Sequence, residues 1–221
     1  LFFVIKNFFI QKNEIIIIYI NKIRGINMIN KLPKIELHCH LDGSVRVDTI
    51  IDIAKKENIK LESYEKCDVE KLVQVPNDCT SLNEYLKRFD LANKVMQSRE
   101  NIKRVTFELL EDAQKENVKY IEVRFAPLLH LNGGLSIEEV IQSAIDGINE
   151  AEKMYDIKGN IILCCMRTMS EDDAILVVEE GKKFLNKGVV AIDLAGPEEE
   201  GFVKKYKKAI ELARSYGYNI T

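Results

Sequence analysis

The stretch of sequence on which the fold depends runs from Lys34 to Ser44 and reads KIELHCHLDGS. Polar and apolar residues alternate from Lys34 to Leu41, and this period of two is typical of a β-strand. One face of that strand is expected to carry Ile35, Leu37, Cys39 and Leu41, and the other Lys34, Glu36, His38 and His40. We therefore predict a strand that buries its apolar face and presents two histidines on its polar face.

Further strands are predicted downstream of this stretch. Residues 120–126 alternate in the same way, with Glu122 and Arg124 on the polar face. Continuous apolar runs at Ile161–Cys165 and Val189–Ile192 are typical of strands that are covered on both faces. The run Tyr218–Thr221 resembles the start of another strand.

Helical periodicity fills the intervals between the predicted strands, with Ser81, Ser136 and Ser170 as expected N-caps. The predicted helices span Thr49–Lys56, Leu82–Gln97, Ile102–Asn117, Ile137–Tyr155, Asp172–Leu185 and Val203–Tyr216. Alternation of strands and helices predicts an α/β fold with a parallel sheet. The pattern alone leaves a doubly wound sheet and a barrel open.

Polar faces on two of the strands favour a barrel. In a (β/α)8 barrel the apolar faces can meet the ring of helices, while polar faces point inward to a site at the carboxyl ends of the strands. The long interval between Ser44 and Gln97 separates the first two strands, and insertions of this kind often cover a pocket. We therefore expect an inserted helical lid after the first strand.

Composition limits the classes of function. The 221 residues include 32 Lys and Arg against 35 Asp and Glu, a formal net charge of −3, and 46% are hydrophobic. These values predict one globular domain and argue against nucleic acid or an anionic membrane as the main partner. Five cysteines, two of them adjacent and none in a C-x-x-C pair, indicate reduced thiols and a cytoplasmic location.

Residues 1–27 differ from the rest of the chain. They are mostly Ile, Phe, Asn and Lys, and their longest apolar run, Ile15–Ile20, is far shorter than the roughly 20 residues that span a bilayer. We interpret this segment as an extension outside the fold, with Met28 as the expected start and residues 28–221 as the domain. A membrane anchor is the alternative.

The histidine pair carries the main chemical hypothesis. An i, i+2 spacing on a strand places His38 and His40 on one face, where both can bind one ion, at about 2.0–2.1 Å for zinc. The alternative is a pair of histidines that are simply hydrogen-bonded in a polar patch. A catalytic zinc site normally takes three protein ligands. The remaining histidine, His130, is expected to be a loop or helix-cap residue and not a ligand.

Two arginines and one glycine stand at predicted strand ends. Arg124 and Arg167 are expected to form structural ion pairs, Arg124 with Glu122 or Glu36. Gly196 ends the fourth strand, where a glycine can let a ligand approach the backbone or can form an ordinary turn.

As a set, these motifs resemble the adenosine deaminases. The stretch Glu36–Ser44 resembles the opening zinc motif of that family, and the resemblance continues in order from Lys31 to the end of the chain. Its further segments are SLNEYLKRFD from Ser81, YIEVRFAP from Tyr120, CCMR from Cys164 and IDLAG from Ile192. Adenine deaminases usually carry an Ile-Glu-Gly-Thr-like stretch in place of Leu41–Ser44, so adenosine is favoured over the free base.

The resemblance implies a zinc-dependent (β/α)8 barrel of purine salvage. Such an enzyme hydrolyses adenosine or 2′-deoxyadenosine to inosine or 2′-deoxyinosine and ammonia, with no nucleic acid or membrane as partner. By position, His38 and His40 resemble zinc ligands, and His40 and Asp42 contact the nucleoside, Asp42 through a ribose hydroxyl. Gly196 resembles the backbone group that meets the purine, and Leu82, Tyr85 and Phe89 resemble the apolar lid.

Two departures from the family pattern bear on function. Pro197 stands where the family usually has an acidic residue, and proline has no N–H, so a backbone donor must come from Gly196 or Glu198. The family's third zinc histidine and its proton-donor glutamate lie in a His-Ala-Gly-Glu motif, which has no counterpart up to Thr221.

We therefore expect the first half of a barrel, about four to five strands, with no catalytic acid within this chain and no activity by itself. One alternative is a non-catalytic protein that binds a nucleoside or a metal. The other is a different H-x-H barrel hydrolase, such as an adenine deaminase, a phosphoesterase or a nuclease.

Overall fold

The sheet of this protein is parallel and has five strands in the order in which they occur along the chain, β1-β2-β3-β4-β5. The structure, a computed structural model, describes residues 31–197 and 202–221. The strands are Lys34–His40 (β1), Val118–Phe125 (β2), Lys158–Met166 (β3), Val189–Ala195 (β4) and Asn219–Ile220 (β5). Sequential parallel strands joined by helices are the first strands of a (β/α)8 barrel, which confirms the predicted fold class. The extension predicted at residues 1–27 lies outside the described residues.

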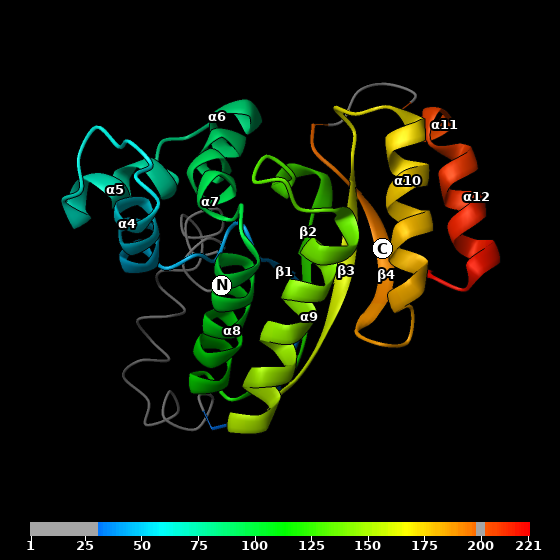
Figure 1. The fold of residues 1–221 in the computed structure, drawn as a ribbon, viewed down its shortest axis with the longest axis horizontal. Coiled ribbons are helices and arrows are strands. Elements are labelled where there is room, and N and C mark those ends of the chain that lie inside the picture. Colours follow the sequence, from blue (N-terminus) through cyan, green and yellow to red (C-terminus); the bar gives the residue numbers. More distant parts are fainter. Residues whose placement is uncertain (1–30, 198–201) are drawn as a thin grey trace.

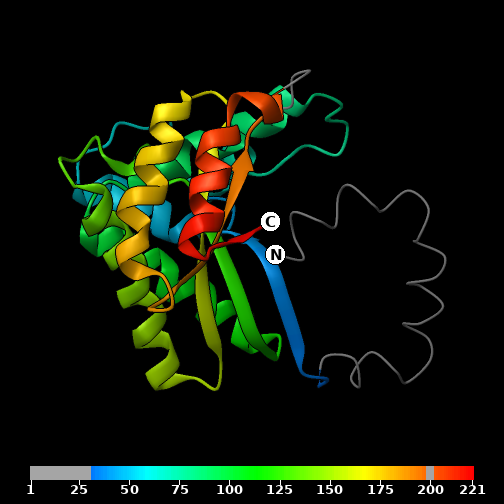
Figure 2. The same ribbon diagram turned by 90° about the vertical axis from the view of Figure 1, so that its right-hand side faces the viewer.

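Helices connect the strands and cover one side of the sheet (Figures 1 and 2). They are α8 (Arg99–Lys115), α9 (Ile137–Met154), α10 (Glu171–Gly181), α11 (Phe202–Lys205) and α12 (Lys207–Tyr216), with short 3-10 turns at Pro127–His130, Lys182–Phe184 and Lys87–Phe89. Helices α8 and α9 approach closely at Gly147, where a Cβ atom would lie 2.5 Å from the carbonyl oxygen of Lys103. The core lies between the sheet and these helices, and Val123, Ile161, Leu163, Ile141 and Val177 are completely buried in it.

Serine side chains begin three of the helices as predicted. Ser136 and Ser170 form capping boxes with Glu139 and Asp173, in which side chain and backbone exchange hydrogen bonds. Ser81 accepts a longer hydrogen bond, 3.4 Å, from the backbone N–H of Glu84. Helices α9 and α10 are therefore capped more completely than the helix that Ser81 begins.

Strand β1 departs from the predicted alternation. Glu36 lies opposite Ile121 and Cys39 lies opposite Val123, so two residues of β1 face one residue of β2 and form a bulge. The side chain of Glu36 accepts a hydrogen bond of 3.0 Å from the backbone N–H of His38 within this bulge. The prediction that Ile35 and Leu37 share a buried face with Cys39 is wrong: their side chains are 69% and 56% exposed, whereas Cys39 is completely buried.

The insertion after β1 is helical, as predicted, but its helices differ from the prediction. It contains α4 (Val47–Lys56), α5 (Lys66–Val73), α6 (Leu82–Leu86) and α7 (Asp90–Val95). The single helix predicted over Leu82–Gln97 is wrong, because a 3-10 turn at Lys87–Phe89 separates α6 from α7. This group of helices lies beside the carboxyl ends of the strands, at the upper left of Figure 1.

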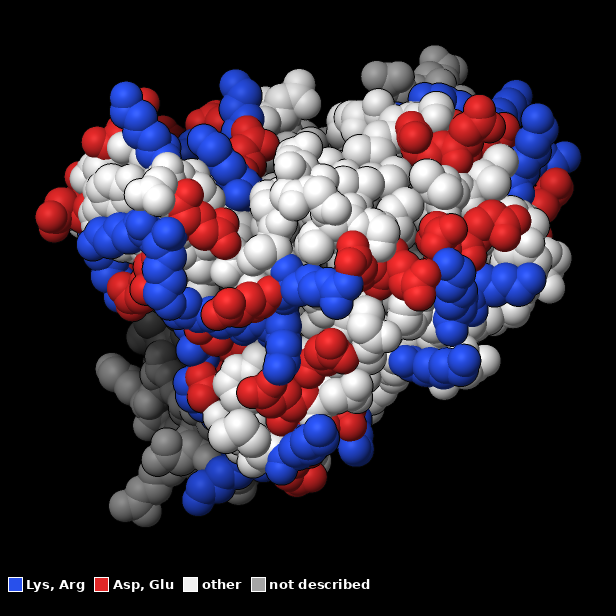
Figure 3. Space-filling view, in the orientation of Figure 1, with Lys and Arg blue, Asp and Glu red and all other residues white. Residues whose placement is uncertain are grey.

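Acidic and basic side chains are interspersed on the face shown in Figure 3. Several of them pair between neighbouring helices, such as Lys103 with Glu150 at 2.6 Å and Lys183 with Glu138 at 2.8 Å. Within the described part of the chain, none of the helices has both the length and the apolar character that crossing a bilayer would require.

Candidate active site

The two histidines predicted as metal ligands converge on one point at the carboxyl end of β1. The Nε2 atom of His38 lies 2.8 Å from Nη1 of Arg124, and the Nε2 atom of His40 lies 2.7 Å from the same nitrogen. The centres of the two rings are 5.5 Å apart. The bulge and the strand spacing therefore bring the same nitrogen of both rings to a single position.

This arrangement favours one hydrogen-bonding role for the Nε2 atom of each ring. A guanidinium group only donates hydrogen bonds, so a bond to Arg124 requires Nε2 to accept with its lone pair. Burial and the nearby Arg124 charge also hold the pKa of His38 below its ordinary value. Two imidazole nitrogens with lone pairs directed at one point are the donor atoms with which histidine binds a metal.

Arg124 is held by charged and polar groups of three strands. Its Nη2 atom lies 2.7 Å from Oδ2 of Asp193 on β4, and both side chains are almost completely buried. Its Nε atom donates to the sulfur of Cys164 on β3 at 3.3 Å. The predicted ion pair of Arg124 with Glu122 or Glu36 is wrong. Glu122 instead accepts from the hydroxyl of Tyr120 at 2.8 Å.

Asp42 follows directly after β1 and lies beside His40. Its Oδ1 atom is 3.7 Å from Nδ1 of His40, too far for a hydrogen bond. Among the described residues, this buried carboxylate oxygen has no hydrogen-bond partner. Since a buried polar atom without a partner is costly, the oxygen is suited to accept a hydrogen from a bound molecule.

The lid reaches the histidines through two aromatic rings. The ring of Phe89 lies 5.6 Å from that of His40, and the ring of Tyr85 packs edge-on against Phe89 at 5.5 Å. Partial burial and the charge of Asp42 raise the pKa of Tyr85 above its ordinary value. Gly43 makes room for Phe89, because a Cβ atom there would lie 3.0 Å from the ring. Leu82, the third predicted lid residue, is 54% exposed.

Gly196 ends β4 at the same edge of the sheet, as predicted, with a positive φ of 104° that favours glycine. Its carbonyl oxygen accepts a hydrogen bond of 2.6 Å from Nη1 of Arg167, which follows β3. The structure thus places Gly196 next to Arg167, with β2 and β3 between β4 and the histidine pair on β1.

His130 and Cys39 are buried core residues. His130 is completely buried at the end of a 3-10 turn, where its Nδ1 lies 3.0 Å from the carbonyl oxygen of Met96. Burial lowers the pKa of His130 to about 4 and raises the pKa of the Cys39 thiol to about 12. His130 therefore stays neutral at physiological pH within the packed core.

The residues present fit part of a metal site. Two converging imidazole nitrogens are a donor set that zinc accepts, and a cationic group already stands at the point where they meet. In the described ranges 31–197 and 202–221, no group of three or more His, Cys, Asp or Glu residues could hold a metal ion. The pair thus supplies two of the three protein ligands that a catalytic zinc site normally takes.

Sequence reasoning missed the roles of Asp193 and Cys164. Asp193 is the one charged residue in the apolar run Val189–Ala195, and this exception was the available signal. Its pairing with Arg124 depends on the order and register of three strands. Periodicity within one strand does not contain that information.

The parallel sheet and the polar cluster at the carboxyl ends of its strands define a (β/α)8-barrel protein, a class that carries its functional site at that end. Residues 33–221 match the family model for adenosine deaminase. The chain therefore belongs to the adenosine deaminase family.

Two curated relatives and one solved structure illustrate the similarity. The chain is 62% identical over 191 residues to an adenosine deaminase of Clostridium botulinum strain 657, covering 86% of this chain and 58% of that protein. It is 60% identical over 196 residues to that of Clostridium perfringens strain 13, covering 89% and 59%. The crystal structure of an Arabidopsis N6-mAMP deaminase superposes with a TM-score of 0.75 at 29% identity, covering 88% and 59%. The chain thus spans somewhat more than half the length of these relatives.

Proposed function

We propose that this protein acts in the hydrolytic deamination of adenosine and 2′-deoxyadenosine, which yields inosine or 2′-deoxyinosine and ammonia in purine salvage. The observation that carries the proposal is the convergence of His38 and His40 at one point beside the unpaired carboxylate oxygen of Asp42. Relatives of 60–62% identity named adenosine deaminase support the choice of reaction. The reduced cysteine pattern favours a cytoplasmic location.

Zinc is the cofactor that the two imidazoles suit. His38 and His40 would hold it through Nε2, and Arg124 would have to yield the position that its Nη1 atom takes between them. When bound, zinc supplies Lewis-acid activation of water for attack on a polarised ring carbon. The buried Asp193 would keep the charge of Arg124 compensated beside the site.

The other site residues would bind and enclose the nucleoside. The free oxygen of Asp42 would accept a hydrogen from a ribose hydroxyl, and His40 lies close enough to contact the same sugar. Tyr85 and Phe89 form an aromatic wall against His40, which would exclude bulk water together with Leu82 at the tip of α6. The backbone N–H of Gly196 would meet the purine, since Pro197 has no N–H to offer.

We infer that residues 28–221 correspond to the N-terminal portion of the deaminase barrel. The chain covers 58% and 59% of two relatives, and the third histidine and proton-donor glutamate implied by the family resemblance have no counterpart in it. We therefore expect these 221 residues alone to lack turnover. The second candidate is binding of a nucleoside without deamination, which the unpaired oxygen of Asp42 would also support.

Zinc binding tests the metal part of the proposal. We expect isothermal titration with zinc alone to show one site in the protein made from its complete coding sequence. His38→Ala and His40→Ala should each weaken zinc binding by at least 10-fold. His130→Gln is the matched control, because the ring of His130 packs against Phe125 and its Nδ1 lies against the carbonyl oxygen of Met96, and this variant should bind zinc as the unchanged protein does. Loss of zinc only in the His130 variant would contradict the assignment.

Substrate assays test the reaction. The coding sequence beyond Thr221 should be read first, because a His-Ala-Gly-Glu motif in frame would supply the missing histidine and acid. The protein from the complete coding sequence should then release ammonia from adenosine faster than from adenine. Tight binding of purine riboside without ammonia release would favour the binding protein, and the reverse preference for adenine would favour an adenine deaminase.

A further inference from the structure

We propose that Arg167 is a positioning residue that holds the backbone at Gly196 in the conformation that binds the purine. The inference rests on the proposed function, because that function gives the Gly196 backbone its ligand. Arg167 acts from the end of β3 on the turn that ends β4. It contacts that turn through both its backbone N–H and its side chain.

Arg167 fixes two successive carbonyl groups of the turn. Its backbone N–H donates to the carbonyl oxygen of Ala195 at 2.7 Å, and its side-chain Nη1 donates to the carbonyl oxygen of Gly196 at 2.6 Å. The first contact continues the β3–β4 ladder, which pairs Met166 with Ala195. The second contact extends that ladder by one residue, at a position where β4 has already ended.

The first contact sets the direction of the Gly196 N–H, and the second holds the peptide plane on the other side of Gly196. In a trans peptide the N–H is antiparallel to the carbonyl group of the same plane, and the described residues contain no cis peptide bond. The carbonyl of Ala195 points to Arg167, so the N–H of Gly196 points away from β3. Pro197, the next residue, has no N–H. Of these two residues, Gly196 is therefore the one that can donate a backbone hydrogen bond to a ligand.

Gly196 needs such a restraint more than another residue would. Its φ of 104° lies in the left-handed region that only glycine adopts at low cost, and glycine also has access to many other conformations. A Cβ atom at Gly196 would lie 3.7 Å from the Cβ and backbone nitrogen of Arg167, so the two residues are packed together. The guanidinium contact therefore selects one conformation from a permissive backbone.

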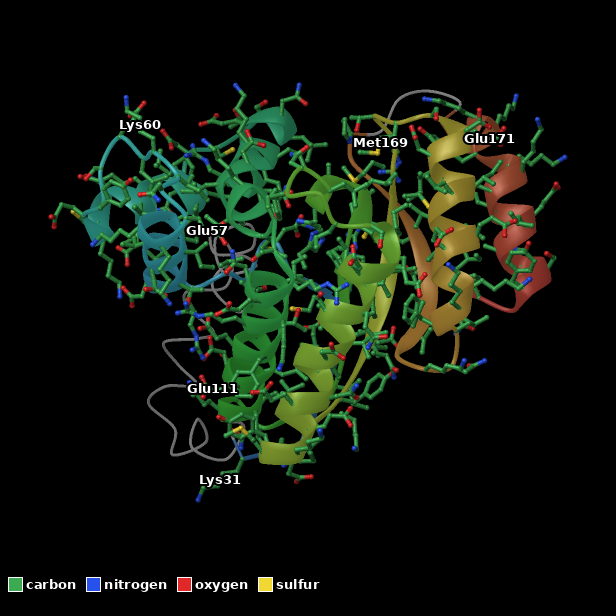
Figure 4. The ribbon with its side chains drawn as sticks, in the orientation of Figure 1. Lys31, Glu57, Lys60, Glu111, Met169 and Glu171 are labelled. Carbon is green, nitrogen blue, oxygen red and sulfur yellow. The ribbon has the colours of Figure 1, made fainter. Side chains whose placement is uncertain are left out.

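The segment that contains Arg167 is itself held in place from the helical layer. The hydroxyl of Tyr206, a completely buried side chain just before α12, lies 2.8 Å from the carbonyl oxygen of Arg167 and 2.6 Å from that of Met169. Figure 4 shows Met169 at the carboxyl end of the sheet, near the start of α10. The support of Gly196 thus runs from Tyr206 through the residues after β3 to Arg167.

Purine riboside binding to the zinc-loaded protein from the complete coding sequence tests the inference. We expect Arg167→Ala to raise the Kd for purine riboside about 10-fold, which is typical of a lost hydrogen bond from a charged group. Added guanidinium ion should recover part of the affinity. If the protein turns over adenosine, KM should rise by the same factor while kcat changes less than about 2-fold. The matched control is Arg214→Ala on the exposed side of α12, which should bind purine riboside normally.

Arg167→Lys keeps the charge but loses the forked guanidinium group. This variant tests the inference if the alanine variant does not fold. It should bind purine riboside at least about 3-fold more weakly than the unchanged protein. Unchanged affinity in either folded variant, or no effect of guanidinium on Arg167→Ala, would overturn this inference but would leave the proposed function in place. If the unchanged protein itself fails to bind purine riboside, the proposed function fails and the inference fails with it.

Discussion

Two regions of the same sheet differ in the regularity of their strand pairing. One region is β2 and β3, and the other is β1. β2 and β3 pair without interruption from Tyr120 opposite Lys158 to Phe125 opposite Leu163. β1 pairs with β2 through two irregularities. Leu163 on β3 is completely buried, whereas Leu37 on β1 is more than half exposed.

The candidate site depends on both regions. The irregular strand β1 supplies His38 and His40. The regular strand β2 supplies Arg124, which contacts both histidines, and β4 supplies Asp193, which pairs with Arg124. A bulge can change the direction of one side chain without disturbing the ladder around it. The comparison indicates that the uninterrupted pairing of β2 with β3 places Arg124, while the bulge in β1 directs the two histidines to it.

The largest expected effect concerns the buried ion pair between β2 and β4. Asp193→Asn should lower the free energy of unfolding by about 3–5 kcal/mol, because Arg124 would keep a buried charge without a counter-ion. Asp156→Asn is the matched control, because Asp156 forms an exposed pair with Lys119 at the amino end of β2. This change should alter the free energy of unfolding by no more than the error of a urea unfolding curve. Equal effects of the two changes would contradict the comparison.

A pair of leucines tests burial directly. Leu163→Ala should cost about 2–5 kcal/mol of unfolding free energy, since it leaves a cavity in the core between β3 and the helices. Leu37→Ala makes the same chemical change on β1, where the side chain is largely exposed, and should cost less than about 1 kcal/mol. Urea unfolding of both variants measures the difference. A larger loss at Leu37 would mean that β1 is covered in solution.

The pH dependence of stability tests the region where β2 meets the lid. The pKa of His130 falls from 6.5 to about 4 on burial, so the unfolded chain binds the proton more readily than the folded chain. Stability should therefore fall as the pH drops from about 6.5 to 4, by about 3 kcal/mol for this group, at about 1.4 kcal/mol per pKa unit. In His130→Gln, this part of the acid dependence should be absent from unfolding curves recorded between these pH values. An unchanged pH profile would show that another group is responsible.

Helix caps give the smallest expected effect. Ser136→Ala removes the capping box of α9 in the regular region and should cost about 1 kcal/mol. Ser81→Ala removes the single, longer cap hydrogen bond of α6 in the lid, and we expect a smaller loss of stability. Amide hydrogen exchange should report faster exchange in the first turn of α9 for the former variant. If Ser81→Ala were the more costly change, the lid would be more tightly capped than its geometry indicates.

Much of the regular region could be predicted from sequence, because its strands and helices follow local patterns. The apolar runs of β3 and β4 and the periodicity of α8 and α9 correspond closely to the observed elements. The i, i+2 spacing of His38 and His40 also predicted that both would lie on one face. The site assignments of Asp42, Gly196 and the lid residues remain predictions until ligand binding is measured.

The remaining features arise from interactions that local patterns do not contain. The bulge in β1 involves a hydrogen bond from the backbone of His38 to the side chain of Glu36, which shifts the alternation by one residue. The pairing of Arg124 with Asp193 connects residues far apart in sequence and follows from strand register. The break between α6 and α7 directs Phe89 to His40, which is a tertiary contact.

The order of the strands in the sheet has a consequence for synthesis on the ribosome. Since β1 to β5 are neighbours in the order in which they are translated, each strand emerges when the strand it pairs with has already been made. Every pairing closes over the one connection between consecutive strands, so no pairing has to wait for a later segment. The chain can thus assemble one strand–helix unit at a time as it leaves the exit tunnel.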